Sequence, residues 1–247
     1  MRYLVLSDLH ANVDALEAVL DSAPTAEWDR VLVLGDLVGY GADPNGVIER
    51  VRALAPAAII RGNHDKAASG LDDGSQFNQV ARLAATWTAS ALTPDNRDWL
   101  RALPAGPVLV DEDVEICHGT PFDEDYYIFD ASDGARAIAV TQRPIAFFGH
   151  THLPVVFTLR GDLFDVVALD GAADTRVPLP PGLKYLVNPG SVGQPRDADP
   201  RAAYAIVDTA ARTLRLRRVD YSVDRAQRRI LAAGLPASLA NRLAIGR

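Results

Sequence analysis

The sequence predicts a layered α/β domain built on a mostly parallel β-sheet. Short apolar runs in the first third of the chain alternate with segments whose apolar residues recur at helical spacing. The apolar runs are continuous rather than alternating, which is typical of strands covered on both faces. The chain has 247 residues, a normal length for an α/β domain, and shows no internal repeat or clear linker. We therefore expect one domain over residues 1–247.

The first elements follow a rhythm of strand, loop and amphipathic helix. Asn12 is placed to cap the first helix, in which Leu16 and Val19 share one face. Asp43 and Pro44 have the residue types of an N-cap and a first helical position. The apolar runs predict strands at 3–6, 31–34 and 57–60.

Residues 66–106 interrupt this rhythm and predict a helical insertion that covers part of the domain. Helices are expected over 77–92 and from Thr93-Pro94 onward, with Leu83 and Trp87 among the inward residues of the first. A mobile lid over a site is one interpretation. Ordinary helical packing is the one we favour, because aromatic and apolar stripes at helical spacing usually face a core.

The rest of the chain predicts a second group of strands and two helical segments. Three consecutive acids, Asp111 to Asp113, resemble a metal patch, but no histidine lies near them in sequence, so we interpret them as a solvated hairpin turn. A C-terminal helical segment over 222–247 would bury Ile230 and Leu231 and end in a solvated arginine-containing continuation. A further helix is expected at 132–140, and strands at 108–110, 114–117, 145–148, 154–159, 163–169, 184–187, 203–207 and 213–219.

Composition excludes several classes of protein. The net charge of −7 argues against a general nucleic-acid binder, which usually carries a basic face. Cys117 is the single cysteine, so an intrachain disulfide and a thiolate metal cage are both excluded, and its strand-like setting predicts a buried core residue. No apolar run has the length of a membrane span, and no signal peptide is recognisable, so we expect a cytoplasmic protein.

All five histidines lie in four short motifs, each of which follows an apolar strand. A fifth motif, Gly35-Asp36, adds a carboxylate after another strand. Loops beyond the carboxyl ends of strands meet at one edge of an open α/β sheet, so we expect these side chains to converge. The histidine motifs are Asp8-Leu9-His10, Gly62-Asn63-His64-Asp65, His118-Gly119 and Gly149-His150-Thr151-His152.

Histidine, Asp and Asn together form the ligand set of a borderline divalent metal ion. One ion takes about four to six ligands, fewer than these motifs offer, so the site is expected to hold two ions. Each motif alone is a common accident or a capped turn; their combination at successive strand ends is what predicts the site. Two adjacent metal ions indicate phosphoryl-ester hydrolysis.

At this point the chain resembles the calcineurin-like metallophosphoesterases. That family's motifs are Asp-x-His, Gly-Asp, Gly-Asn-His-Asp or Glu, a His before Gly, and Gly-His-x-His, and all occur here in order from Asp8 to His152. Residues 37–45, 188–192 and 193–196 further resemble the small bacterial and archaeal phosphodiesterase-like branch. The resemblance implies a four-layer αββα sandwich: two mixed β-sheets flanked by helices, with the metal site at the carboxyl ends of the strands.

The resemblance also implies a role for each matched residue. His64 would assist the leaving group, and Asp65 would orient its ring. The implied reaction is in-line attack on a phosphate ester by a metal-bridging hydroxide, with a phosphodiesterase favoured over a phosphomonoesterase or a dinucleoside polyphosphate hydrolase. One ion would be held by Asp8, His10, Asp36 and His152, and the other by Asp36, Asn63, His118 and His150, with Asp36 as the bridge.

The sequence specifies the substrate contacts and the identity of the metal less closely than it specifies the metal ligands. Arg196 is the best candidate for a phosphate contact, although pairing with a nearby Asp is equally consistent; Tyr126 and Tyr127 are candidates for stacking on a base or aryl group, or for the core. Nitrogen and oxygen ligands suit Mn, which we favour, or Fe, Zn, Ni or Co, and argue against Mg alone. The expected partner is a small phosphate ester, nucleotides included; homo-oligomerisation stays open.

Two readings from other classes compete with an enzyme. A eukaryotic retromer subunit resembles the family in fold but has lost catalytic residues and binds proteins, so a non-catalytic interaction scaffold is one alternative. The intact His64 and Asp36 argue against it. A dinucleotide-binding module is the other, and the absence of Gly-x-Gly-x-x-Gly after the first strand weakens it.

Overall fold

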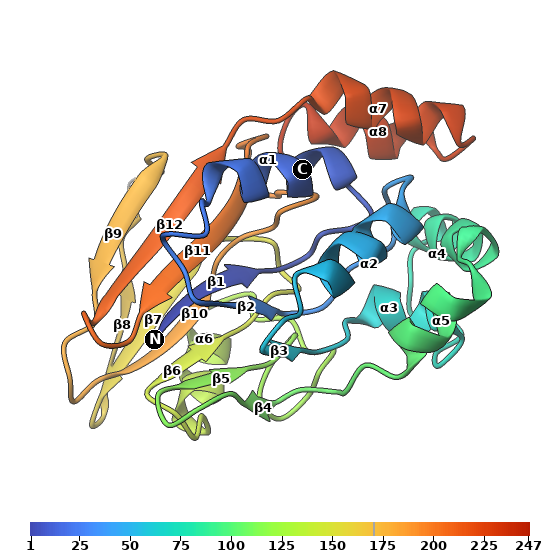
Figure 1. Cartoon of the computed structure of the whole chain (residues 1–247). Coiled ribbons are helices and arrows are strands. Elements are labelled where there is room, and N and C mark those ends of the chain that lie inside the picture. The colour runs from blue at the N-terminus through green and yellow to red at the C-terminus, as the bar shows by residue number, and fades with distance from the viewer. Residues whose placement is uncertain (170) are drawn as a thin grey trace.

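The computed structural model describes residues 1–169 and 171–247, which form two six-stranded sheets (Figure 1). The first sheet has the order β3 (Ala58–Ile59), β2 (Arg30–Val33), β1 (Arg2–Leu6), β11 (Ala202–Asp208), β12 (Thr213–Val219) and β9 (Asp174–Pro178). The second has the order β4 (Val108–Leu109), β5 (Val114–Ile116), β6 (Ile145–Phe147), β10 (Lys184–Asn188), β7 (Val155–Arg160) and β8 (Leu163–Val167).

Both sheets are mixed. In the first, β1, β2 and β3 are parallel, and β11, β12 and β9 add antiparallel neighbours. In the second, β5, β6 and β10 are parallel, and β4, β7 and β8 are antiparallel additions. The helices are α1 (Val13–Ser22), α2 (Pro44–Ala53), α3 (Asn63–Ser69), α4 (Gln79–Ala91), α5 (Pro94–Arg101), α6 (Ala131–Ala139), α7 (Val223–Ala232) and α8 (Ala237–Leu243).

The layers follow from the alternation of side chains along each strand. In β1, Leu4 and Leu6 pack with residues of α1 and α2, whereas Tyr3 and Val5 belong to the core between the two sheets. A third core lies between the second sheet and α6, and Figure 1 shows α6 on the opposite side of the molecule from α1 and α2. This arrangement confirms the predicted αββα sandwich of two mixed sheets.

The predicted helix caps are present. Asn12 Oδ1 accepts a hydrogen bond from the backbone N–H of Ala15 at 3.1 Å, and Asp43 Oδ1 accepts one from Gly46 at 3.1 Å, with Pro44 as the first helical residue. Because α1 and α2 begin immediately after the loops of β1 and β2, these caps also fix where the functional loops end.

Several predicted elements need correction. Helix α3 over residues 63–69 and strand β9 are not among the elements that the sequence predicts. Leu83 and Leu231, expected inward, are 51% and 52% exposed. The C-terminal stretch is not a solvated continuation of α7: it turns at Gly234 and forms α8, whose Leu239 and Leu243 are buried against α7, α4 and Tyr40.

Two other sequence inferences hold. Cys117 is a buried free cysteine, and the acidic stretch from Asp111 is a turn in which Asp111 Oδ1 accepts backbone hydrogen bonds from Asp113 and Val114, both at 2.8 Å. No helix in the described part of the chain is both long and apolar enough to span a bilayer.

Candidate metal centre

The loops that carry the histidine motifs meet at one end of the sandwich. They leave the carboxyl ends of β1, β2 and β3 in the first sheet and of β5 and β6 in the second. Hydrogen bonds join them within each sheet, because the N–H of Asp8 donates to the Gly35 carbonyl and the N–H of Gly149 to the His118 carbonyl. Between the sheets, the backbone N–H of His150 donates to Oδ1 of Asp8 at 3.2 Å. The two sheets therefore contribute to a single site.

The backbone at this site has an unusual conformation. Five of the seven predicted metal ligands have a left-handed φ, between 47° at His10 and 67° at His150. Non-glycine residues rarely adopt this region, and they cluster at functional sites where the surrounding structure holds them. The five ligands with a left-handed φ are Asp8, His10, Asp36, His150 and His152.

The first group of ligand atoms comes from Asp8, His10, Asp36 and His152, all buried and within 4.8 Å of one another. Nε2 of His10 lies 3.1 Å from Nε2 of His152, and Nε2 of His152 lies 3.4 Å from Oδ1 of Asp8. Two nitrogens and carboxylate oxygens that converge on one point provide the donors that a borderline divalent ion requires.

The second group comes from Asp36, His118 and His150, also buried and within 4.8 Å of one another. Asn63 lies beside it, because its Oδ1 is 3.3 Å from Nε2 of His118. The rings of His118 and His150 pack edge to face at 4.9 Å.

Asp36 belongs to both groups. Its Oδ2 lies 3.6 Å from Nε2 of His10 and 3.6 Å from Nε2 of His118, while its Oδ1 accepts a hydrogen bond from the backbone N–H of His64 at 2.9 Å. A carboxylate with two oxygens can face two ions, so this residue is placed to bridge them.

In each of the four ligand histidines, one ring nitrogen lies against a backbone carbonyl. Nδ1 of His10, His118 and His152 lies 3.1, 2.7 and 2.6 Å from the carbonyl oxygens of Val38, Leu34 and Gln194. A carbonyl only accepts, so each Nδ1 carries a proton, and each Nε2 is the nitrogen that faces the site and can bind a metal ion once it is unprotonated. In His150 the roles are reversed, because Nε2 contacts the Asp125 carbonyl at 3.0 Å and Nδ1 remains for a metal. The residues present therefore fit two divalent ions.

The electrostatics of the metal-free centre agree with this. Burial holds the pKa values of His10, His150 and His152 well below the usual value, so these rings stay neutral. Burial alone would also lower the pKa of His118, but the Asp36 carboxylate outweighs it and raises the pKa to about 10. Without metal, a proton on His118 thus supplies the positive charge that the buried carboxylates need.

Glycine is required at position 149, where the loop after β6 packs against the loop after β1 that carries Asp8. A Cβ at Gly149 would fall on Oγ of Ser7 and lie 2.8 Å from Oδ2 of Asp8. That Oδ2 accepts a hydrogen bond from Ser7 Oγ at 2.6 Å. Any larger residue at position 149 would displace the first ligand of the site.

The comparison with known proteins identifies the family. The model of the calcineurin-like phosphoesterase superfamily domain matches residues 1–212. The chain belongs to this superfamily. The predicted resemblance is therefore confirmed.

Similar proteins extend the match to the whole chain. A metallophosphoesterase structure from Sphaerobacter thermophilus is 38% identical, with a TM-score of 0.86 over 100% of both chains. The protein MJ0912 of Methanocaldococcus jannaschii is 32% identical over 98% of this chain and 97% of its own length. The phosphodiesterase YfcE of Escherichia coli K12 is 26% identical over 84% of this chain and 88% of its own length.

In this calcineurin-like phosphoesterase, His64 lies next to the ligand groups without joining them. Its ring is buried against His10, Tyr40 and Phe77, with centroid distances of 5.1, 4.3 and 4.6 Å. Burial lowers its pKa to about 4, so the ring is neutral at pH 7. Its Nδ1 has no hydrogen-bond partner among the described residues.

The prediction that Asp65 orients the His64 ring is not supported, because Asp65 accepts no hydrogen bond from that ring's Nδ1. Its Oδ1 accepts from the backbone N–H of Val38 at 3.2 Å and its Oδ2 from that of Gly62 at 2.9 Å. Both oxygens are thus used to cap α3 and to tie it to the loop after Asp36. Asp65 positions the loops of this phosphoesterase rather than the imidazole.

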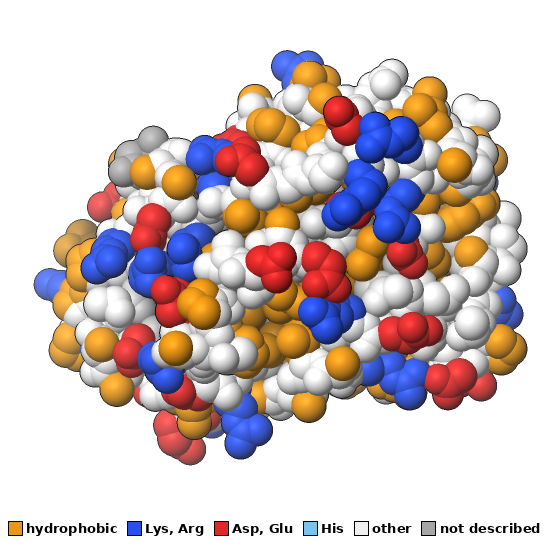
Figure 2. Space-filling model, turned by 45° about the horizontal axis from the view of Figure 1, so that its top comes forward, with side chains coloured by type: hydrophobic (Ala, Val, Ile, Leu, Met, Phe, Trp, Pro, Cys, Tyr) orange, Lys and Arg blue, Asp and Glu red, His pale blue; other side chains and the backbone are white. Residues whose placement is uncertain are grey.

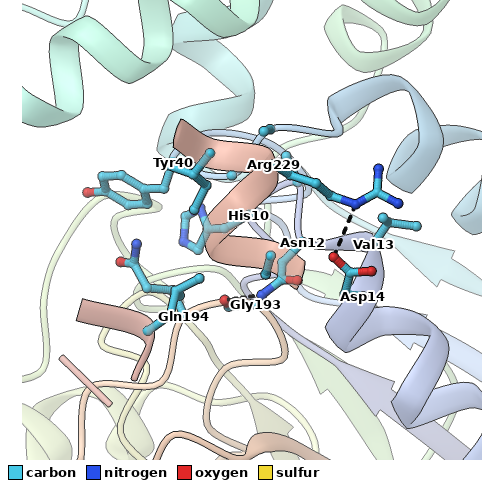
Figure 3. A pocket seen from close by; sticks show the side chains of 14 residues that line it. His10, Asn12, Val13, Asp14, Tyr40, Gly193, Gln194 and Arg229 are labelled. Carbon is cyan, nitrogen blue, oxygen red and sulfur yellow. Dashed lines mark hydrogen bonds and ion pairs between the residues drawn. The ribbon is translucent and has the colours of Figure 1, made fainter. Parts of the chain in front are cut away.

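The predicted substrate residues separate into two groups. Tyr127 stacks on His150 with centroids 3.6 Å apart, and the guanidinium of Arg196 lies 5.8 Å from the Tyr40 ring centroid, so both border the centre. Tyr126 lies elsewhere: its hydroxyl contacts Asp133 at 2.9 Å, next to Arg136 on α6. Figure 3 shows Tyr40, His10 and Gln194 beside one another, with the Asp14–Arg229 ion pair on the other side of His10.

Sequence reasoning missed three contributors to the site. Phe77 stacks on His64, but in sequence it is only the first apolar residue of a predicted helix. The carbonyl of Gln194 holds His152, and a backbone group leaves no side-chain pattern to detect, although the motif 193–196 contains it. Arg242, on α8, places its guanidinium 5.8 Å from the Tyr40 ring centroid and was read as part of a solvated tail.

Proposed function

We propose that the chain is a binuclear metal-dependent phosphodiesterase that hydrolyses a small phosphate ester. The observation that carries this proposal is the sharing of Asp36 between two buried groups of ligand atoms. A single structural ion would need only one such group, whereas two ions side by side form a clamp suited to phosphoryl transfer to water.

Asp8, His10, Asp36 and His152 would hold one ion, and Asp36, Asn63, His118 and His150 the other. When bound, such ions supply Lewis-acid stabilisation of phosphoryl oxygens and make a water molecule acidic enough to lose a proton near neutral pH. Because the donors are imidazole nitrogens and oxygens, we propose Mn, with Fe, Zn, Ni or Co as substitutes.

The reaction joins a water oxygen to phosphorus, breaks the bond between phosphorus and the ester oxygen, and leaves a proton on that ester oxygen. His64 is placed to assist the last step, since it lies beside His10 and Asp36 but has no ligand role. As a neutral ring it donates one N–H hydrogen bond, which stabilises charge on the leaving oxygen.

Arg196 is placed to bind the phosphate. Its Nε is buried without a hydrogen-bond partner among the described residues, and its Nη2 donates to Oε1 of Gln194 at 3.1 Å. It forms no ion pair with a described carboxylate; Asp197 and Asp199 are paired with Arg218 and Arg201 instead. A guanidinium fork that is free of carboxylates suits phosphate oxygens.

The diester preference is supported by the relative named as a phosphodiesterase in Escherichia coli. Phosphomonoester or dinucleoside polyphosphate hydrolysis would use the same centre. The non-catalytic scaffold is disfavoured because His64 and six of the seven proposed ligands, all except Asn63, are buried together at one site.

A hydrolysis panel with added Mn tests the proposal. It compares bis-p-nitrophenyl phosphate, p-nitrophenyl phosphate, cyclic nucleotides and diadenosine tetraphosphate, each with and without a chelator. We expect Mn-dependent turnover, fastest on a diester. Faster turnover of the monoester would replace the phosphodiesterase assignment by that of a phosphomonoesterase. Absence of turnover of every substrate by the Mn-loaded chain would contradict the enzyme proposal and favour the non-catalytic interaction scaffold.

A further inference from the structure

A cavity of about 540 Å³ opens between the start of α4 and α8, next to the metal centre. Tyr40 contributes to its lining, and the ring of Tyr40 also packs against the rings of His10 and His64, with centroids 4.8 and 4.3 Å apart. Tyr40 therefore borders both the cavity and the metal centre. The volume is in the range of small-molecule sites, and large enough for the part of a substrate beyond its scissile phosphate.

The polar groups of this cavity are suited to an anion. Asn78, Gln79, Ser238 and Arg242 contribute to its lining, and none of its lining residues is acidic. Gln79 and Ser238 are exposed, so their side chains are accessible to a bound molecule. Arg225, Arg228 and Arg229 also lie exposed on α7, beside α8, and Figure 2 shows a group of Lys and Arg side chains on this face. Arg225 and Arg229 form ion pairs with Asp14, and Arg229 also with Asp43.

Arg242 and Arg196 converge on Tyr40 from different segments of the chain. Each guanidinium lies 5.8 Å from the centroid of that ring, and neither forms an ion pair with an Asp or Glu side chain in the described residues. Arg242 uses its Nε to donate to the carbonyl of Arg247, which leaves both Nη groups. Burial and the nearby Arg196 lower the pKa of Arg242, as expected for two cations with no anion between them.

We propose that this cavity is a substrate subsite in which Arg242 binds a second phosphate group of the substrate while the scissile phosphate lies at the metal centre. This proposal rests on the proposed function, because its ligand is the remainder of that substrate. It narrows the substrate class to phosphate esters that carry another phosphate. The last helix of the chain thereby becomes a specificity element, with Arg196 between the two phosphates.

The test compares two ligands that cannot be hydrolysed, methylphosphonate and methylenediphosphonate, by calorimetry on the Mn-loaded chain. Wild type is expected to bind the diphosphonate more tightly. Arg242→Gln should reduce that preference about tenfold, the size expected for one charge-assisted hydrogen bond, and leave methylphosphonate affinity within about twofold. Arg228→Gln removes the same charge from α7 and serves as the matched control. Metal content after each titration checks for chelation.

Arg242→Lys keeps the charge and tests folding: an unchanged melting temperature with an intermediate preference would support the subsite. Equal losses for both ligands in Arg242→Gln, or none, would overturn it, as would an equal effect of Arg228→Gln. Because both probes bind without turnover, the result is independent of whether the hydrolysis panel succeeds.

Discussion

Nε2 of His10 and Nε2 of His152 lie 3.1 Å apart, although the two residues are separated by 142 positions in the sequence. Both rings have Nδ1 against a backbone carbonyl, so two lone pairs face each other in a buried site. Such an arrangement is unfavourable unless a cation lies between the nitrogens. A metal ion or a proton would relieve the repulsion, and burial disfavours the proton because it lowers the pKa of both rings.

Removal of the shared carboxylate should affect both ions. Asp36→Asn is expected to reduce the metal content from about two Mn per chain to below one, whereas Asp8→Asn should leave about one, because Asp8 belongs to a single group. Metal analysis after gel filtration measures this, with the exposed Asp98→Asn on α5 as control. Equal metal contents in Asp36→Asn and Asp8→Asn would show that Asp36 does not bridge.

Substitution of His64 should lower the rate of turnover without reducing metal binding. His64→Gln is expected to retain both ions, since the ring is in neither ligand group, and to lower kcat by about 10²-fold or more. Steady-state kinetics with parallel metal analysis is the measurement. An unchanged kcat would remove the leaving-group role, and a loss of metal would make His64 a structural residue.

The metal-free chain should lose stability in acid partly through His64. Its folded pKa, which burial lowers to about 4, lies below the usual 6.5, so between these values the unfolded chain binds more protons. The contribution of His64 is therefore complete above about pH 6.5 and is lost as the pH falls toward 4, by about 3 kcal/mol in total.

Urea unfolding in chelator at pH 7.5 and 4.5 measures this, with His64→Gln as the reference that lacks the group. The buried His10, His150 and His152 titrate in both chains, so the difference between the two isolates His64. Identical losses in wild type and variant would contradict the assignment.

Gly149→Ala should weaken metal binding by a steric clash rather than by backbone strain. The added Cβ meets Ser7 and Asp8, so we expect weaker Mn binding together with lower stability. Gly161→Ala is the contrasting control: its φ of 57° disfavours alanine, but nothing lies near its Cβ. It should cost about 1 kcal/mol and leave Mn affinity unchanged. Equal Mn affinities in the two variants would disprove the steric argument.

The sequence predicted those features that depend on local pattern. Apolar runs located β1, β2 and β6, and the placement of Asp8, Asp36 and His150 beyond them was enough to predict convergence. The αββα layering came from the resemblance rather than from the pattern, because which strands join the second sheet depends on pairings such as β10 with β6 that are remote in sequence.

Other features could not be read from the sequence, for physical reasons. Helix α3 begins within the motif Gly62 to Asp65, and Asp65 caps that helix. Because the motif is interpreted as a metal and catalytic loop, its residues do not stand out as a helix start. Strand β9 is an edge strand of mostly exposed residues, held by its pairing with β12. The sequence around Arg242 is typical of a solvated helix end, and its position beside Tyr40 depends on the turn at Gly234 that places α8 there.

Anomalous diffraction from crystals grown with Mn tests the central claim most directly. We predict two peaks about 3.5–4 Å apart, with the Asp36 carboxylate between them, His10 and His152 at one peak and His118 and His150 at the other. A single peak, or peaks that none of these histidines contacts, would contradict the binuclear centre.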